Sequence, residues 1–112
     1  MPKREMKLLL QDIIENAEMI FQFVGSDSYE EFVKDKMKVY AVVRAFEIIG
    51  EASKIISTDI KLAYPLIEWQ LMTDFRNLLS HHYFGIEYEI LWKTIKESLP
   101  YNYEMLKQMK TE

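Results

Sequence analysis

The chain has 112 residues, of which 49% are hydrophobic and 29% are charged, and it contains only three glycines and three prolines. This composition excludes an intrinsically disordered chain, and so few turn-forming residues argue against a β-sandwich or a β-barrel. The absence of cysteine excludes disulfides and thiolate metal sites, and the net charge of −4 excludes a general nucleic-acid coat protein, which is normally basic. We therefore expect a single all-α domain over residues 1–112.

The first predicted element is an amphipathic helix over residues 3–24, in which apolar residues recur at three- and four-residue steps. Gly25 follows at the position expected for a helix C-terminal cap. Gln11 and Asp12 interrupt the apolar run at residues 8–10, so we expect neither a signal peptide nor a membrane span. Together with the absence of cysteine, this favours a cytoplasmic protein.

The turn after this helix is expected to start the next one. Ser28 and Glu31 have the spacing of a capping box, in which each side chain accepts a hydrogen bond from the other residue's backbone N–H. Asp27 with Glu30 offers an alternative register of the same motif. A short helix is therefore predicted over residues 29–34.

The most regular predicted helix covers residues 35–56. Gly50 lies inside it, where glycine is less favourable than alanine by about 1 kcal/mol, and a close approach of a second helix would explain its presence. The apolar residues of this helix and the seven methionines of the chain are expected in the core or in a dimer interface. The apolar stripe consists of Val39, Val42, Phe46, Ile49 and Ile56.

The remaining sequence predicts further helices separated by proline or by polar segments. A short helix must end before Pro65, because the residue before proline avoids the α-helical conformation. Another helix is expected to end near Leu79, and the next begins near Glu87. Pro100 is predicted to kink or restart this last helix, which then continues over residues 101–110. The elements together predict an up-and-down bundle of four to five helices.

The stretch from Arg76 to Tyr83 combines an arginine, an amide (Asn77), two imidazoles (His81 and His82) and a phenol within eight residues. Arginine supplies a permanent forked charge that suits phosphate oxygens, and an imidazole with a pKa of about 6.5 exchanges a proton near neutral pH. These groups predict metal-independent cleavage of RNA, in which the imidazole deprotonates the ribose 2′-OH and the guanidinium stabilises charge on the phosphate. DNA lacks that hydroxyl, so we expect that it is not cleaved.

Ordinary structural roles are the alternative for these residues: an ion pair for Arg76 and a loop hydrogen bond for His81. The spacing of one arginine and one histidine occurs in many helices by chance. No metal site is predicted, because adjacent histidines point in different directions and no pair of ligands has the spacing of a zinc motif. The sequence also contains no glycine-rich phosphate loop and no nucleophile elbow.

Three segments and one tryptophan match a known pattern in order and spacing. The central run is Arg76-Asn77-x3-His81-x-Tyr83-Phe84-x-Ile86. Residues 44–52 read R-A-F-E-I-I-G-E-A, residues 64–69 read Y-P-L-I-E-W, and Trp92 follows at the expected position. In this combination the chain resembles the HepT-like proteins of the HEPN superfamily, whose corresponding segments read R-A-L-E-I-I-G-E-A and Y-P-x-I-P-W.

The resemblance implies a HEPN-like helical bundle, a homodimer, and the toxin of a two-gene toxin–antitoxin system. In that family the toxin is a metal-independent ribonuclease without a cofactor. Its antitoxin is a minimal nucleotidyltransferase (MNT) that can add adenylyl groups to the motif tyrosine (AMPylation). Carried over, Arg76 and His81 would be catalytic, Asn77 would support the site, and Tyr83 would be both a site residue and the AMP acceptor. The implied partners are a second copy, the MNT antitoxin and RNA, with no membrane.

Several residues depart from this pattern or lie outside its motif. His82 stands where the family often has glycine, so a second imidazole is a candidate for a supporting role. Glu87 replaces the usual aspartate and is expected to serve as a helix-start charge. Glu51 is a candidate supporting residue, whereas Glu47, one helical turn earlier, is expected on a solvated or ion-paired face. A basic cluster either guides RNA or marks an exposed helix start; it consists of Lys34, Lys36 and Lys38.

Because one arginine and one histidine make a sparse active site, we expect a composite cleft between two subunits. The alternative function is a non-catalytic subunit that binds a nucleotide or docks a nucleotidyltransferase, with Arg76 holding phosphate. The acidic net charge favours this alternative, because it gives RNA no long-range attraction. A purely structural role is the third interpretation.

Overall fold

The computed structural model describes residues 3–80 and 87–110, except for the side chains of residues 3, 77–80 and 110. All regular elements within these ranges are helical, which confirms the predicted all-α class. In chain order they are α1 (Lys3–Val24), α2 (Tyr29–Lys34), α3 (Lys36–Ile55), α4 (Thr58–Ala63), α5 (Trp69–Ser80), α6 (Tyr88–Lys93), the π-helical segment η1 (Thr94–Ser98) and α7 (Leu99–Lys110). No helix in the described ranges is long and apolar enough to cross a membrane.

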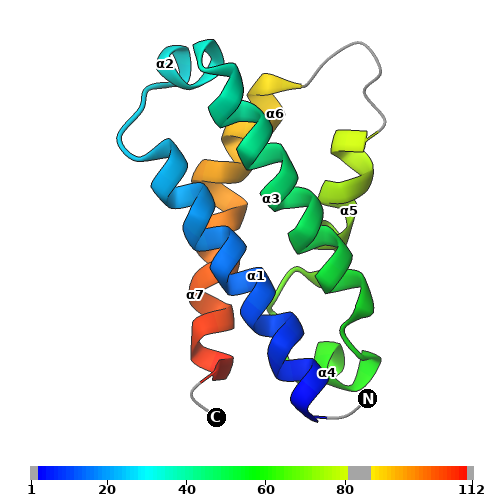
Figure 1. Cartoon of the computed structure of the whole chain (residues 1–112). Coiled ribbons are helices and arrows are strands. Elements are labelled where there is room, and N and C mark those ends of the chain that lie inside the picture. Colours follow the sequence, from blue (N-terminus) through cyan, green and yellow to red (C-terminus); the bar gives the residue numbers. More distant parts are fainter. Residues whose placement is uncertain (1–2, 81–86, 111–112) are drawn as a thin grey trace.

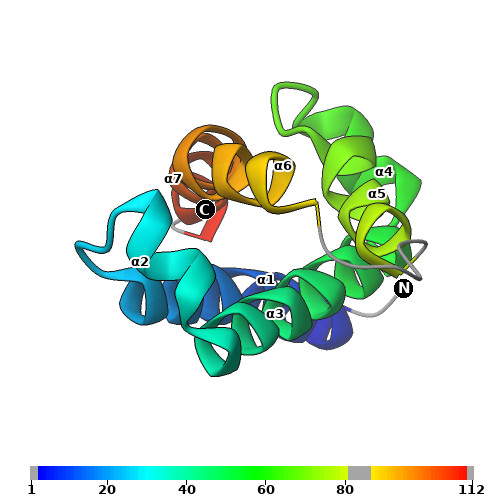
Figure 2. The same cartoon turned by 90° about the horizontal axis from the view of Figure 1, so that it is seen from above.

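The long helices lie side by side and alternate in direction (Figure 1). Seen from above, α3 has α1 on one side and α5 on the other (Figure 2), and it packs against both. α1 also contacts α7. We call the end where α5 finishes and α6 begins the α5–α6 end, and the opposite end, which carries α4, the α4 end.

The prediction of four to five helices is too low. The described residues form seven α-helices and η1, although α6, η1 and α7 follow one another without a break and make one rod. The two six-residue helices α2 and α4 were both predicted as separate elements, so the total of four to five is smaller than the number of helices predicted one by one.

The turn between α1 and α2 confirms the predicted caps. Gly25 has a positive φ of 53° and donates its N–H to the Phe21 carbonyl at 2.8 Å, which ends α1. The capping box is formed by Ser28 and Glu31: the Glu31 N–H donates to Ser28 Oγ at 3.1 Å, and the Ser28 N–H donates to Glu31 Oε1 at 2.8 Å. The alternative register that begins at Asp27 is therefore wrong.

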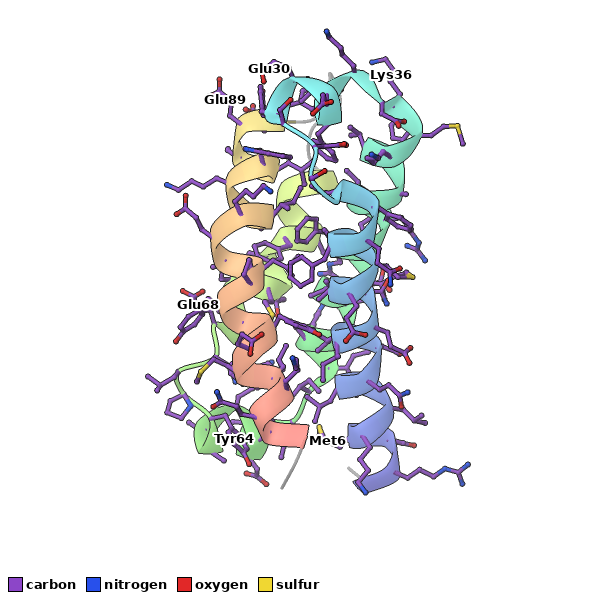
Figure 3. The ribbon with its side chains drawn as sticks, turned by 90° about the vertical axis from the view of Figure 1, so that its left-hand side faces the viewer. Met6, Glu30, Lys36, Tyr64, Glu68 and Glu89 are labelled. Atoms are coloured by element: carbon purple, nitrogen blue, oxygen red, sulfur yellow. The ribbon has the colours of Figure 1, made fainter. Side chains whose placement is uncertain are left out.

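Asp27 instead binds the start of α3. Its Oδ2 accepts a hydrogen bond from Lys38 Nζ at 2.6 Å, and this contact raises the pKa of Lys38. Of the basic cluster, Lys38 is thus paired within the protein, while Lys34 and Lys36 are exposed. Lys36 also lies at the first position of α3 (Figure 3), as the interpretation of an exposed helix start requires.

The apolar stripe of α3 lies in the core, as predicted. All five of its members are at most 3% exposed, from Val39 to Ile56. The methionines are divided: Met6, Met72 and Met109 are buried, whereas Met37 is 85% exposed at the start of α3.

The interruption predicted at Pro100 takes the form of η1. Proline lacks an N–H, and its ring would collide with the carbonyl of the residue four positions earlier in a regular α-helix. The wider π-helical turn relieves this crowding, and the Leu99 N–H reaches back to the Thr94 carbonyl. The rod therefore continues through the proline without a break.

Candidate functional site

Arg76 lies in the second half of α5, at a close contact of this helix with α3. The contact point on α3 is Gly50, which is buried. A Cβ atom at position 50 would lie 2.7 Å from Arg76 Cβ, 3.0 Å from the Arg76 backbone nitrogen and 3.2 Å from the Met72 carbonyl oxygen. The close helix approach predicted from the glycine is confirmed, and its partner is the candidate catalytic arginine.

The apolar seam between α3 and α5 lies beside this contact. The rings of Phe46 and Phe75 meet edge to face, with centroids 5.2 Å apart and an interplanar angle of 78°. Both rings and Met72 are nearly fully buried, whereas Arg76 is half-buried. Because its root is packed and its side chain is partly exposed, Arg76 is suited to present a guanidinium to an anion at the surface.

The start of α5 is tied to α7 by a buried amide. Asn102, 1% exposed, accepts a hydrogen bond from the Glu68 N–H at 2.8 Å and donates to Glu68 Oε1 at 2.9 Å. It also donates to the Ser98 carbonyl at 2.9 Å. Glu68 lies against the α7 part of the rod (Figure 3).

Asn102 was not identified as a structural residue from the sequence, although its position in the apolar pattern indicates one. It interrupts the apolar run that contains Leu99 and Leu106, at helical spacing. A polar residue in such a position must be hydrogen-bonded when it is buried. It fixes the helix that carries Arg76.

Two neighbouring contacts strengthen the same junction. Trp69 donates its indole N–H to the Tyr64 carbonyl at 3.1 Å, and Tyr101 donates its hydroxyl to the Leu66 carbonyl at 2.7 Å. The segment that resembles Y-P-x-I-P-W is thus the anchor of α5. Glu68 occupies the position of the second proline of that pattern, and only a non-proline residue has the N–H that Asn102 binds.

Most of the predicted site residues lie outside what the structure describes. His81, His82 and Tyr83 fall in the undescribed residues 81–86, and for Asn77 the structure describes the backbone in α5 but no side chain. Among the candidate site residues, Arg76 and Glu51 have described side chains. The proximity of arginine and histidine therefore stays a prediction.

The acidic candidates lie on α3 around Gly50. Glu51 is the next residue in the chain and is exposed, and Glu47, three residues earlier, is half-buried. Both therefore lie within about one helical turn of the Arg76 contact. Among the described residues, no group of three or more His, Asp or Glu side chains could hold a metal ion.

An aromatic cluster closes the α5–α6 end of the molecule. Trp92 of α6 packs against Tyr29 and Phe32 of α2, with ring centroids 5.9 Å and 5.4 Å apart. The ammonium group of Lys96 lies 4.7 Å from the centre of the Trp92 ring. These contacts hold the start of α6 against α2.

Comparison with known proteins matches nearly the whole chain to one family. The family model described as "Ribonuclease HepT-like" matches residues 13–109. The matched region includes α3, α5 and the rod formed by α6, η1 and α7, and thus both helices that meet at Gly50 and Arg76.

Individual relatives agree with this match. The chain is 47% identical to "Putative RNase MJ1380" of Methanocaldococcus jannaschii, over 89% of this chain and 92% of that protein. It is also 47% identical to "Probable ribonuclease HepT" of Thermococcus cleftensis, over 88% of this chain and 89% of that protein. Among solved structures, no match was found.

Proposed function

The chain belongs to the HepT-like ribonuclease family, and on this premise we propose that it is a metal-independent endoribonuclease that acts as the toxin of a HEPN/MNT toxin–antitoxin system. The observation that carries the proposal is the placement of Arg76. This arginine is half-buried, its Cβ rests on the backbone of α3, and it precedes His81 by five residues. A cation held in this way, with two histidines five and six residues later in the chain, suits RNA cleavage better than a plain structural role does.

The proposed reaction is an intramolecular phosphoryl transfer. The His81 imidazole takes the proton of the ribose 2′-OH, and the 2′-oxygen attacks the neighbouring phosphorus. The bond from phosphorus to the 5′-oxygen breaks, which leaves a 2′,3′-cyclic phosphate, and the 5′-oxygen takes a proton from water or from a protonated imidazole and leaves as a 5′-hydroxyl. The Arg76 guanidinium stabilises the negative charge that develops on the phosphate oxygens.

Supporting roles are proposed for the remaining candidates. Asn77 orients the phosphate or the guanidinium, His82 is a second proton donor or acceptor, and Glu51 is an acceptor at the edge of the site. Tyr83 is the proposed acceptor of AMP from the MNT antitoxin. An adenylylated phenol would add bulk and negative charge in the stretch that contains Arg76, and this would oppose RNA phosphate.

A homodimer is proposed on the basis of the outer side of α3. Several residues there follow one another at steps of three and four, so they share one side of the helix. Three of them are large and exposed: Met37 at 85%, Tyr40 at 65% and Ile55 at 54%. We call this set the α3 outer stripe; it consists of Met37, Tyr40, Arg44, Ile48, Glu51 and Ile55.

The α3 outer stripe includes Glu51, which adjoins Gly50 in the chain. A second subunit docked on the stripe would therefore lie close to Arg76 and could complete a composite cleft. The test is the sedimentation behaviour of Tyr40→Glu, with Leu62→Glu on α4 as the control, since Leu62 is at least as exposed (72%) but lies off the stripe. The proposal requires a dimer that Tyr40→Glu dissociates and Leu62→Glu preserves; a monomeric wild-type protein with full RNase activity would refute the composite cleft.

The ribonuclease proposal is tested with purified protein and cellular RNA in the presence of EDTA. Arg76→Ala and His81→Ala are expected to lose cleavage, whereas Arg4→Ala, which removes an exposed arginine of α1, is expected to keep it. An RNA with a single 2′-deoxy residue at the cleavage position should resist. Cleavage that persists in both Arg76→Ala and His81→Ala would remove these residues from the mechanism.

The alternative is a non-catalytic subunit that binds a nucleotide or a nucleotidyltransferase. The net charge of −4 favours it, because a protein of this sign repels an RNA backbone at long range. Expression in cells separates the two functions. Growth arrest that His81→Ala abolishes supports the ribonuclease, and the absence of arrest together with tight nucleotide binding supports the alternative.

A further inference from the structure

The glycine at position 50 has no conformational reason to be glycine. Among the described residues, Gly25 is the glycine with a positive φ, and Gly50 lies in the regular part of α3. Alanine is the better helix former at such a position. The reason for glycine must therefore be the space that its missing side chain leaves.

That space is filled by α5 at Arg76. Of the three atoms that a Cβ at position 50 would crowd, two belong to the α5 backbone, namely the Arg76 nitrogen and the Met72 carbonyl oxygen. The third, Arg76 Cβ at 2.7 Å, is fixed by that backbone. No side-chain rotation relieves such a contact. Carbon atoms pack at about 3.5–4.0 Å, so α5 would have to move away from α3 by roughly 1 Å.

The rest of α5 is held too firmly to absorb this movement elsewhere. Its first turn is bound to α7 through Glu68 and Asn102. Phe75, which precedes Arg76 in the same turn, is packed on Phe46 of α3, so this contact would be displaced together with Arg76. A displacement at Gly50 would therefore be concentrated on the turn of α5 that carries Arg76.

We propose that Gly50 is a positioning residue for Arg76: its missing side chain lets the arginine root rest directly on the α3 backbone and so sets where the guanidinium meets the RNA phosphate. This inference rests on the proposed ribonuclease function. Catalytic groups must be held within about 0.5 Å of their working geometry, and a backbone contact meets this demand better than a flexible side chain does.

The main experiment compares Gly50→Ala with Gly25→Ala. Both variants add one methyl group to a glycine. At Gly25 the new methyl group makes only an ordinary contact, 3.8 Å from the Gln22 carbonyl oxygen, but strains a positive φ, so this variant is destabilised without touching Arg76. A misplacement of about 1 Å can cost about 100-fold in rate. We expect Gly50→Ala to lower kcat by tenfold to 100-fold with a smaller change in KM, and Gly25→Ala to keep the wild-type kcat.

A double variant separates positioning from general damage. If Gly50 acts through the guanidinium, Gly50→Ala should lower the residual rate of Arg76→Ala no further, whereas independent losses would multiply. The Arg76 Nε–H resonance supplies a readout besides activity, since the chain has three arginines and Arg76→Ala assigns the signal. It should shift in Gly50→Ala and stay in place in Gly25→Ala.

The outcomes distinguish this inference from the proposed function. The role of Gly50 alone is overturned if Arg76→Ala loses activity while Gly50→Ala keeps the wild-type kcat and an unmoved Arg76 resonance. Full activity in Arg76→Ala overturns the proposed function, and the resonance then still reports on the contact. Should Gly50→Ala not fold, Gly50→Ala/Arg76→Gly, which removes the shortest of the three contacts, should regain stability in part; a double variant that is no more stable than Gly50→Ala overturns the assignment of the main contact to Arg76 Cβ.

Discussion

Replacing Asn102 by alanine should weaken the attachment of α5 to α7 and lower the stability of the whole protein. The buried amide makes three hydrogen bonds of 2.8–2.9 Å, two with Glu68 and one with the Ser98 carbonyl. Alanine removes all three, and it leaves the Ser98 carbonyl without this partner in a region where Asn102 itself is 1% exposed.

The size of the effect follows from these bonds. Each contributes about 1 kcal/mol net, and an unsatisfied buried group costs about 1–3 kcal/mol. Glu68 is exposed, so water replaces part of what its N–H and carboxylate lose. We expect a loss of about 2–3 kcal/mol, out of a total of about 5–15 kcal/mol for a domain of this kind. At about 4 °C per kcal/mol, Tm falls by about 10 °C.

The assay is thermal unfolding followed by circular dichroism, with Tyr101→Phe as the control. Tyr101 also bonds across this junction, to the Leu66 carbonyl, but it is 45% exposed, and its loss should cost less than about 1 kcal/mol. A Tm for Asn102→Ala within about 2 °C of the wild type would refute the claim that the amide anchors α5. Equal shifts in both variants would show that burial adds nothing.

Three further predictions concern other parts of the fold. Ser28→Ala removes half of the capping box and should cost about 1 kcal/mol in chemical denaturation. Phe46→Ala deletes a buried ring from the seam between α3 and α5 and should cost about 3–5 kcal/mol in the same measurement. The hydrogen bond from the Tyr103 hydroxyl to Glu18 raises the pKa of Tyr103 to about 12; its stabilising effect is therefore complete below the ordinary value of about 10 and disappears as the pH rises toward 12. In Glu18→Gln the Tyr103 midpoint, read as the tyrosinate absorbance that Tyr103→Phe removes, should fall toward 10, and an unchanged midpoint would contradict the assigned cause.

Local features of the fold were predictable from the sequence because their causes are local. The ends of α1 and α2 follow from Gly25 and from the Ser28–Glu31 pair, whose partners are three or four residues away. The buried stripe of α3 follows from the helical period. The π-helical form of η1 was not predictable, because Pro100 demands relief of crowding but does not specify which kind.

Contacts between distant residues were predictable only in part. Gly50 indicated a close helix approach, but its partner Arg76 lies 26 positions later, and no periodicity relates the two. Likewise, Asn102 and Glu68 are 34 residues apart. Such pairs depend on how helices dock, which the apolar pattern of a single helix does not determine. The histidines and the tyrosine of the candidate site lie outside the described residues, so their prediction rests on the sequence motif.

The two tryptophans lie near opposite ends of the molecule, so each serves as a fluorescence probe of its own end. Trp69 is buried at the start of α5, toward the α4 end, with its indole N–H on a carbonyl oxygen. Trp92 is partly exposed at the α5–α6 end, between two aromatic rings and an ammonium group. Water contact shifts indole emission to longer wavelengths. In a variant that keeps only Trp69, the emission would report on the start of α5, and in a variant that keeps only Trp92 it would report on the α5–α6 end. RNA or an antitoxin that approaches the α5–α6 end should change the emission of Trp92 and leave that of Trp69 unchanged.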